Sequence, residues 1–199
     1  MGLIAKSEGG TFEQVEPGTY SARCYGVIDI GTQRNEWQGE TKHQHQVIIQ
    51  WELPEELMND GRPFGVSKFY TLSLHEKANL CGDLQAWRGR EFTEEEKKGF
   101  DISKLVGVPC MLSVIHNQQG KARVQSVMKL PKGMVVPDQV NESVLFDLDA
   151  YICGDTKTWD KLSDGIKGII LKAKEFDKVD DFPPEGSLPN DIISDDIPF

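Results

Sequence analysis

The chain has 199 residues, a formal net charge of −10 and an apolar fraction of 38%. This length predicts one domain of about 120–150 residues with appended segments, and the apolar fraction is that of a folded protein. The sequence contains no run of eighteen apolar residues and no basic stretch followed by an apolar one. We therefore expect neither a membrane span nor a signal peptide, and a cytoplasmic location.

The charge is unevenly distributed along the chain. Residues 1–135 hold 16 Lys and Arg against 17 Asp and Glu, a balance of −1, whereas residues 136–199 hold 6 against 15, a balance of −9. The acidity of the whole chain therefore does not exclude nucleic acid as a partner of the N-terminal part. Equally, a near-neutral body does not by itself indicate nucleic-acid binding.

Hydrophobic alternation begins in residues 19–30, after a glycine-containing segment, residues 1–16, that we interpret as a mobile arm. The alternation predicts a long first strand with Cys24, Ile28 and Ile30 on one and the same apolar face. Gly26 near the middle of this strand indicates a bend or bulge.

A polar loop is predicted over residues 31–41, before the second strand. Apolar residues at helical spacing predict a helix over residues 75–88, and Thr93 with Glu96 forms a capping-box pattern for a short acidic turn. Alternating residues that include many β-branched and aromatic side chains predict the remaining strands at residues 44–53, 64–74, 106–116 and 122–130.

Three strands, a helix and two strands follow one another in this order, which is the plan of a five-stranded OB-fold barrel. An SH3-like barrel or a small sandwich has compatible strand spacing, but the long bent first strand and the helix between strands 3 and 4 favour the OB-fold. We assign the mainly β OB-fold domain to residues 17–135. Residues 136–181 form an extension with one helix over residues 159–176, packed on the barrel or on a second copy of the chain.

Residues 182–199 are an acidic tail with an apolar end. From position 175 onward the chain has eight acids and one base, a composition that cannot offset the entropy of ordering, so we expect a disordered tail. A pocket with an apolar cleft and a basic rim would capture the end of the tail, whereas the alternative is a frayed terminus with an incidental Phe. The predicted partner-binding tip consists of Asp195, Asp196, Ile197, Pro198 and Phe199.

This tip resembles the C-terminal end of bacterial and phage single-stranded DNA-binding proteins, in which it recruits replication, recombination and repair proteins. Residues 70–80, 84–90 and 105–110 resemble stretches of small OB-fold single-stranded DNA-binding proteins of bacteriophages. By order of elements the resemblance covers about residues 18–135. It implies a role in DNA replication or recombination in the host cytoplasm, and it assigns no individual DNA-contacting residue.

Single strands are held by a basic groove and by aromatic faces on which bases stack. Trp37 is the leading candidate, because it lies in the polar loop, whereas Trp51 and Trp87 fall on apolar faces and are assigned to the core. Phe69, rather than Tyr70, is expected to point outward unless a bulge shifts the register. The candidate DNA-binding residues are Arg23, Tyr25, Arg34, Trp37, Lys42, Lys68, Phe69, Lys121 and Arg123.

No catalytic motif and no complete metal-ligand set is evident, so we expect no enzyme activity, no cofactor and no metal. His43 and His45 are interpreted as polar strand residues, since no further ligand has fitting spacing. The cysteines are far apart in the sequence, which favours buried free thiols at Cys24, Cys81, Cys110 and Cys153.

We therefore expect sequence-independent binding of single-stranded DNA, with the acidic tip recruiting partner proteins. A homodimer would place two barrels on one strand and raise avidity. The alternative is a protein-interaction module of a phage replication or virion assembly that does not bind DNA, which the near-neutral body favours.

Overall fold

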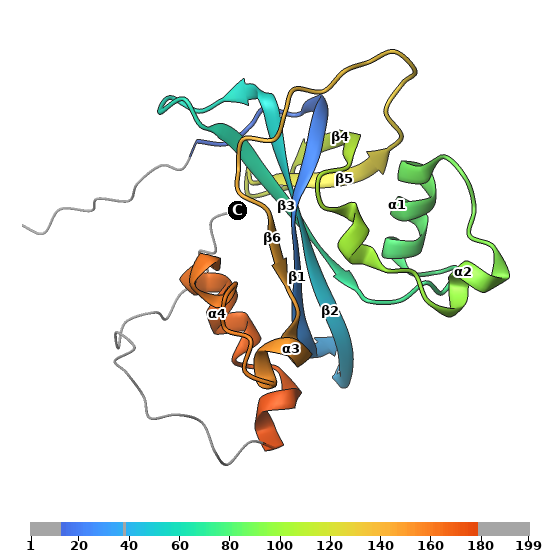
Figure 1. Cartoon of the computed structure of the whole chain (residues 1–199), viewed down its shortest axis with the longest axis vertical. Helices are drawn as coiled ribbons and strands as arrows, with labels where there is room; N and C mark the ends of the chain where they lie inside the picture. Colours follow the sequence, from blue (N-terminus) through green and yellow to red (C-terminus); the bar gives the residue numbers. More distant parts are fainter. Residues whose placement is uncertain (1–12, 38, 179–199) are drawn as a thin grey trace, which may run out of the picture.

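The computed structural model describes residues 13–37 and 39–178. Most of the predicted arm and all of the predicted tail, including the tip, lie outside these residues. The fold is mainly β (Figure 1), as the sequence predicts, with strands β1 (Gly18–Trp37), β2 (Glu40–Leu57), β3 (Pro63–Thr71), β4 (Pro109–His116), β5 (Ala122–Met128) and β6 (Val144–Phe146). The helices are α1 (Asn79–Arg88), α2 (Glu94–Lys98), α3 (Leu148–Ile152) and α4 (Asp164–Ile170), with 3-10 turns η1 (Ile102–Leu105), η2 (Trp159–Lys161) and η3 (Lys174–Lys178). None of the helices in the described residues is long and apolar enough to span a membrane.

The strands form one open sheet in the order β3-β2-β1-β4-β5, with all neighbours antiparallel, while β6 pairs in parallel with β1. The helix α1 connects β3 to β4, where the sequence predicts it. Within the described residues no ladder of hydrogen bonds joins the edge strands β3 and β5. The predicted five-stranded closed barrel is therefore corrected to an open six-stranded sheet. Single contacts bridge the two edge strands instead: Lys68 Nζ on β3 donates to the carbonyl of Gln125 on β5 at 3.1 Å.

Strand β1 bends at the predicted place, because its register against β2 shifts between Cys24 and Gly26. A shift of one residue exchanges the two faces of a strand. Cys24 therefore faces the main core, whereas Ile28 and Ile30 face a second apolar cluster. The prediction that Ile28 and Ile30 continue the face of Cys24 is wrong for this reason.

The main core lies between the sheet and α1. The alternation of β2 places Trp51 in it, and the helical stripe of α1 places Trp87 beside it, with ring centroids 5.9 Å apart. The assignment of both tryptophans to the core is thus confirmed. Three of the four cysteines are buried free thiols, but Cys153 is exposed, because it follows α3 at the surface.

The C-terminal part of the fold packs on the outer face of β1, as the sequence predicts in one of its two alternatives (Figure 1). Leu162, Ile170 and Ala173 are buried in the same apolar cluster as Ile28. The predicted helix over residues 159–176 is confirmed only for α4, which has seven residues, because the 3-10 turns η2 and η3 occupy the two ends of this range. Ser163 interrupts the helical run: its side chain accepts from the Ile166 amide and begins α4 as an N-cap.

The predicted polar loop over residues 31–41 is also corrected. Strands β1 and β2 continue through it as a two-stranded ribbon, in which Trp37 pairs with Glu40. Gly39, which precedes β2, takes a left-handed φ of 81°, a conformation that favours glycine. Polar side chains on both faces of the ribbon give no alternation, so the sequence pattern ends before the strands do.

Candidate nucleic-acid interface

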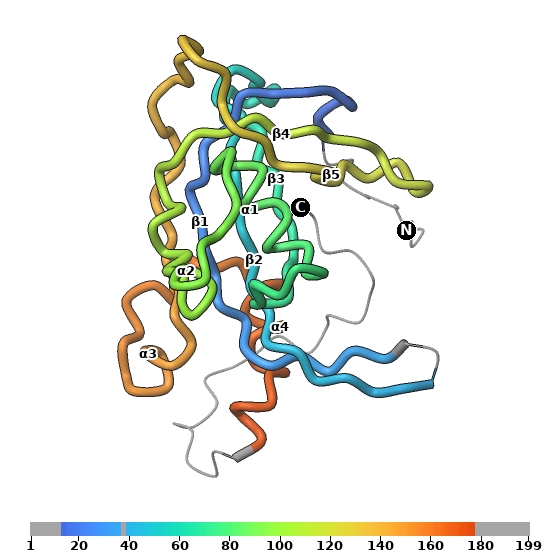
Figure 2. Tube along the Cα trace, turned by 90° about the vertical axis from the view of Figure 1, so that its right-hand side faces the viewer, coloured from blue at the N-terminus to red at the C-terminus, as the bar shows by residue number. Residues whose placement is uncertain are grey.

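Two hairpins project from the same side of the sheet, with β3 and α1 between them (Figure 2). The first is the β1–β2 ribbon, which carries Arg34, Lys42 and, at its end, Trp37. Arg34 lies 2.6 Å from Glu36 and Lys42 lies 3.5 Å from Glu40. These four side chains are mostly exposed, and exposed ion pairs contribute little stability, so a phosphate can replace either acid.

The second hairpin joins β4 to β5 and carries Lys121 and Arg123, both half-buried. Asn117 fixes the turn, because its Oδ1 accepts from the amides of Gln119 and Lys121, both at 2.9 Å. Gly120 completes the turn with a φ of 75°. Lys121 and Arg123 thus lie at the turn end of a hairpin that projects on the same side as the ribbon.

Strand β3 lies between the hairpins and turns its aromatic residues in opposite directions. Tyr70 is buried in the main core. Phe69 lies on the opposite face, as the parity of the sequence indicates, and its half-buried ring packs against the second apolar cluster. Lys68 is held in place by Asp83 of α1, with 2.7 Å between Nζ and Oδ2. The hydroxyl of Tyr70 donates to the same oxygen at 2.7 Å, and burial raises the pKa of Tyr70.

The two candidates on the first half of β1 have other surroundings. The guanidinium of Arg23 donates to the carbonyls of Gly107, Val136 and Pro137, at 2.8 to 3.2 Å. Tyr25 is half-buried, and burial, followed by the charge of Glu52, raises its pKa to about 12. Arg23 therefore anchors the connection between β5 and β6, which lies beside it.

A cleft of about 410 Å³ opens between β2, β3 and the connection from β3 to α1. Of the residues that line this cleft, only Phe69 is among the candidates predicted from the sequence. The polar side chains on one face of β2 indicate two more lining residues, Gln44 and Gln46, and the connection from β3 to α1 adds a cation, Lys77. The residues that line the cleft include Gln44, Gln46, Phe69, Thr71, His75 and Lys77. A flat aromatic wall, amides and a cation together suit a planar polar ligand that bears negative charge.

A second cleft, of about 340 Å³, opens at the lower end of the sheet, beside η1 and β6. It is of similar size but of opposite charge, since Asp29, Asp101 and Asp147 line it together with apolar side chains. Phosphates would be repelled from this cleft. Within the described residues, no group of His, Cys, Asp and Glu side chains is arranged to hold a metal ion.

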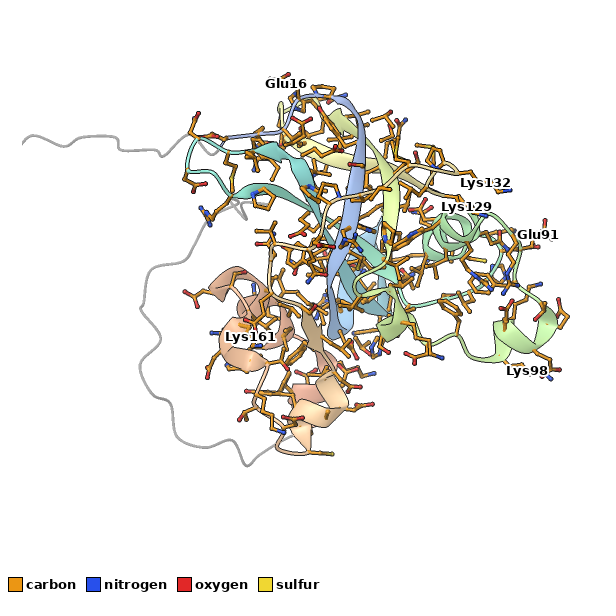
Figure 3. All side chains as sticks on the ribbon, turned by 45° about the horizontal axis from the view of Figure 1, so that its top comes forward. Glu16, Glu91, Lys98, Lys129, Lys132 and Lys161 are labelled. Atoms are coloured by element: carbon orange, nitrogen blue, oxygen red, sulfur yellow. The ribbon has the colours of Figure 1, made fainter. Side chains whose placement is uncertain are left out.

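Other lysines are scattered over the surface. Figure 3 shows Lys98, Lys129 and Lys132 toward α1 and α2, and Lys161 on the C-terminal part of the fold. Lys161 pairs with Glu142, and Lys98 lies 2.8 Å from Glu95. Lys161 therefore lies on another part of the fold than the two hairpins and the cleft.

Comparisons of the chain with protein-family models, with curated proteins and with solved structures give no match. A functional assignment therefore depends on the geometry of this face and on the chemistry of its side chains.

Proposed function

We propose that this protein binds single-stranded DNA without reading its sequence, on a sheet of the OB-fold plan. One observation carries the proposal: the cleft beside Phe69 lies on the face of β2 and β3, and the β1–β2 and β4–β5 hairpins project on the same side. In OB-folds the face of strands 2 and 3 and these two hairpin loops bind oligonucleotides. DNA replication or recombination is the process in which such a protein acts.

The chemistry needed is phosphate neutralisation and base stacking. Arg34 and Lys42 on one hairpin, with Lys121 and Arg123 on the other, provide cations on either side of β3. Each base stacked on an aromatic ring contributes about 1–3 kcal/mol. Trp37 at the end of the ribbon and Phe69 on β3 are the rings that we assign to stacking.

Protection of backbone amides from hydrogen exchange tests the proposal. Addition of oligo-dT to the full chain should slow exchange in residues 32–46, 64–75 and 117–125 and leave α2 and α4 unchanged. Protection confined to other elements, or its complete absence, would overturn the proposal.

A protein-interaction module is the second candidate, and the ion pairs of the candidate cations favour it. Arg34, Lys42 and Lys68 each lie beside an acid of the same chain, so the field around them is weaker than their number suggests. In this case DNA would leave hydrogen exchange unchanged, and a protein partner would protect the hairpins instead.

A further inference from the structure

We infer that the cleft between β2, β3 and the connection to α1 is a pocket for one nucleotide of the bound strand. Its base would lie against Phe69, its base edge would meet the amides of Gln44 and Gln46, and its phosphate would meet Lys77. The inference rests on the proposed function and deepens it. One nucleotide of the bound strand would have a site of its own, while the rest of the strand is held by charge and stacking.

The size of the cleft suits a single nucleotide. Pockets for small molecules have volumes of about 300–1,000 Å³, and the cleft, at about 410 Å³, lies near the lower end of this range. A run of several stacked nucleotides would need an open groove. The segment that contains Ser73, His75 and Lys77 lines the cleft at one side, so the strand would enter and leave on the other side.

The walls offer hydrogen bonds to a base edge. The side-chain oxygen of Gln44 accepts a hydrogen bond from the side-chain NH₂ group of Asn35 at 3.3 Å. The NH₂ group of Gln44 therefore points away from this bond. Gln46, two residues along the same face of β2, offers both a donor and an acceptor. Every base has adjacent donors and acceptors on its pairing edge, so these amides can bind different bases. A nucleotide that lacks its base would not form these hydrogen bonds.

The phosphate end of the cleft has donors, and no Asp or Glu is among the residues that line the cleft. The Lys77 amide donates to Nδ1 of His75 at 3.2 Å, so the neutral imidazole carries its hydrogen on Nε2 and can donate it. Lys77 is exposed and forms no ion pair with the described residues. The first turn of α1 contains no acidic residue, which removes one source of repulsion for an anion at Lys77.

Titration of the full chain with dTMP, with thymidine and with deoxyribose 5-phosphate, followed by NMR, tests this pocket. We expect dTMP to shift the side-chain amides of Gln44 and Gln46 and the backbone amide of Lys77, and to bind more tightly than either fragment. Gln46→Ala and Lys77→Ala should each weaken dTMP binding about 3- to 10-fold, whereas Lys157→Ala, an exposed lysine elsewhere, should not.

Binding of labelled oligo-dT by the same variants separates the pocket from the general function. Lys77→Ala should lower the salt slope of oligo-dT binding by about 0.7 relative to Lys157→Ala, the value for one phosphate of a single strand. Normal oligo-dT binding by all variants, with no shifts in the cleft on addition of dTMP, would overturn the pocket and leave strand binding in place. If dTMP shifts the NMR signals of the cleft but the wild-type protein does not bind oligo-dT, the proposed strand binding would be excluded instead.

Discussion

Arg23 and Glu52 lie opposite each other on β1 and β2, and both hold the same crossing segment, residues 131–143. Arg23 donates to the carbonyls of Val136 and Pro137, while the carboxylate of Glu52 accepts from the amides of Val140 and Asn141 at 2.8 and 2.7 Å. Glu52 is fully buried. Two charged residues of opposite sign thus attach the long connection between β5 and β6 to the sheet.

Loss of the Glu52 carboxylate should therefore destabilise the fold. Glu52→Gln leaves buried amides facing an NH₂ group, and we expect a loss of about 2–4 kcal/mol in the free energy of unfolding. Urea unfolding followed by fluorescence measures it, with Glu40→Gln as the control, since Glu40 is exposed and should change stability by less than about 0.5 kcal/mol. Equal stability of the two variants would contradict the role of Glu52.

Substitution of Trp37 should change the affinity for DNA, whereas substitution of Trp87 should change the stability of the fold. Trp37→Ala should weaken oligo-dT binding by about 1–3 kcal/mol, the contribution of one stacked base, with an unchanged melting temperature. Trp87→Ala removes a buried ring of the main core and should lower stability by about 3–5 kcal/mol. Unchanged DNA affinity of a folded Trp37→Ala protein would exclude Trp37 from the interface.

Alternation alone predicts the inner face of β2, where Val47, Ile49 and Trp51 are all buried. It fails where polar groups hold the structure. The ribbon is polar on both faces, and the crossing segment is fixed by Arg23 and Glu52, which have the pattern of surface residues. Their buried contacts join parts of the chain about 90 to 110 positions apart, and no local pattern encodes these contacts.

In the candidate site, too, local alternation predicts some features, whereas others depend on parts of the chain that are distant in sequence. The parity of β3 predicts that Tyr70 points inward and Phe69 outward, because both residues belong to one regular strand. The cleft, in contrast, forms only because Lys77 and Gln46 line the same space, and this depends on the path of the chain after β3. Two of the candidate cations, Arg23 and Lys68, are held by backbone carbonyls and by an acid, respectively.

Glu96 should titrate far below an ordinary glutamate. Hydrogen bonds from Arg90, then from the Thr93 amide of the capping box and from Arg88, lower its pKa to about 2. Because the pKa is lower in the folded protein, the carboxylate stabilises the fold above its ordinary pKa, and this contribution is lost as the pH falls toward 2. A ¹³C NMR titration of the carboxyl carbon measures the pKa, and a value near 4.5 would contradict the ion pairs.

From the sequence we expect residues 192–199 to recruit partner proteins and not to bind DNA. Their removal should leave the affinity for oligo-dT unchanged or increase it, because an acidic segment is attracted to any basic surface and competes with phosphate. Recovery of partner proteins on immobilised full chain and on the shortened chain measures recruitment. Equal recovery on both would exclude the tip as the recruiting element.

Anisotropy of labelled oligo-dT, titrated with the full chain at several salt concentrations, tests strand binding most directly. If Arg34, Lys42, Lys121 and Arg123 each neutralise one phosphate, log K should fall against log salt with a slope of about −3. Such a slope would support a strand held between the two hairpins. Absence of binding at low salt, or an affinity that does not change with salt, would contradict it.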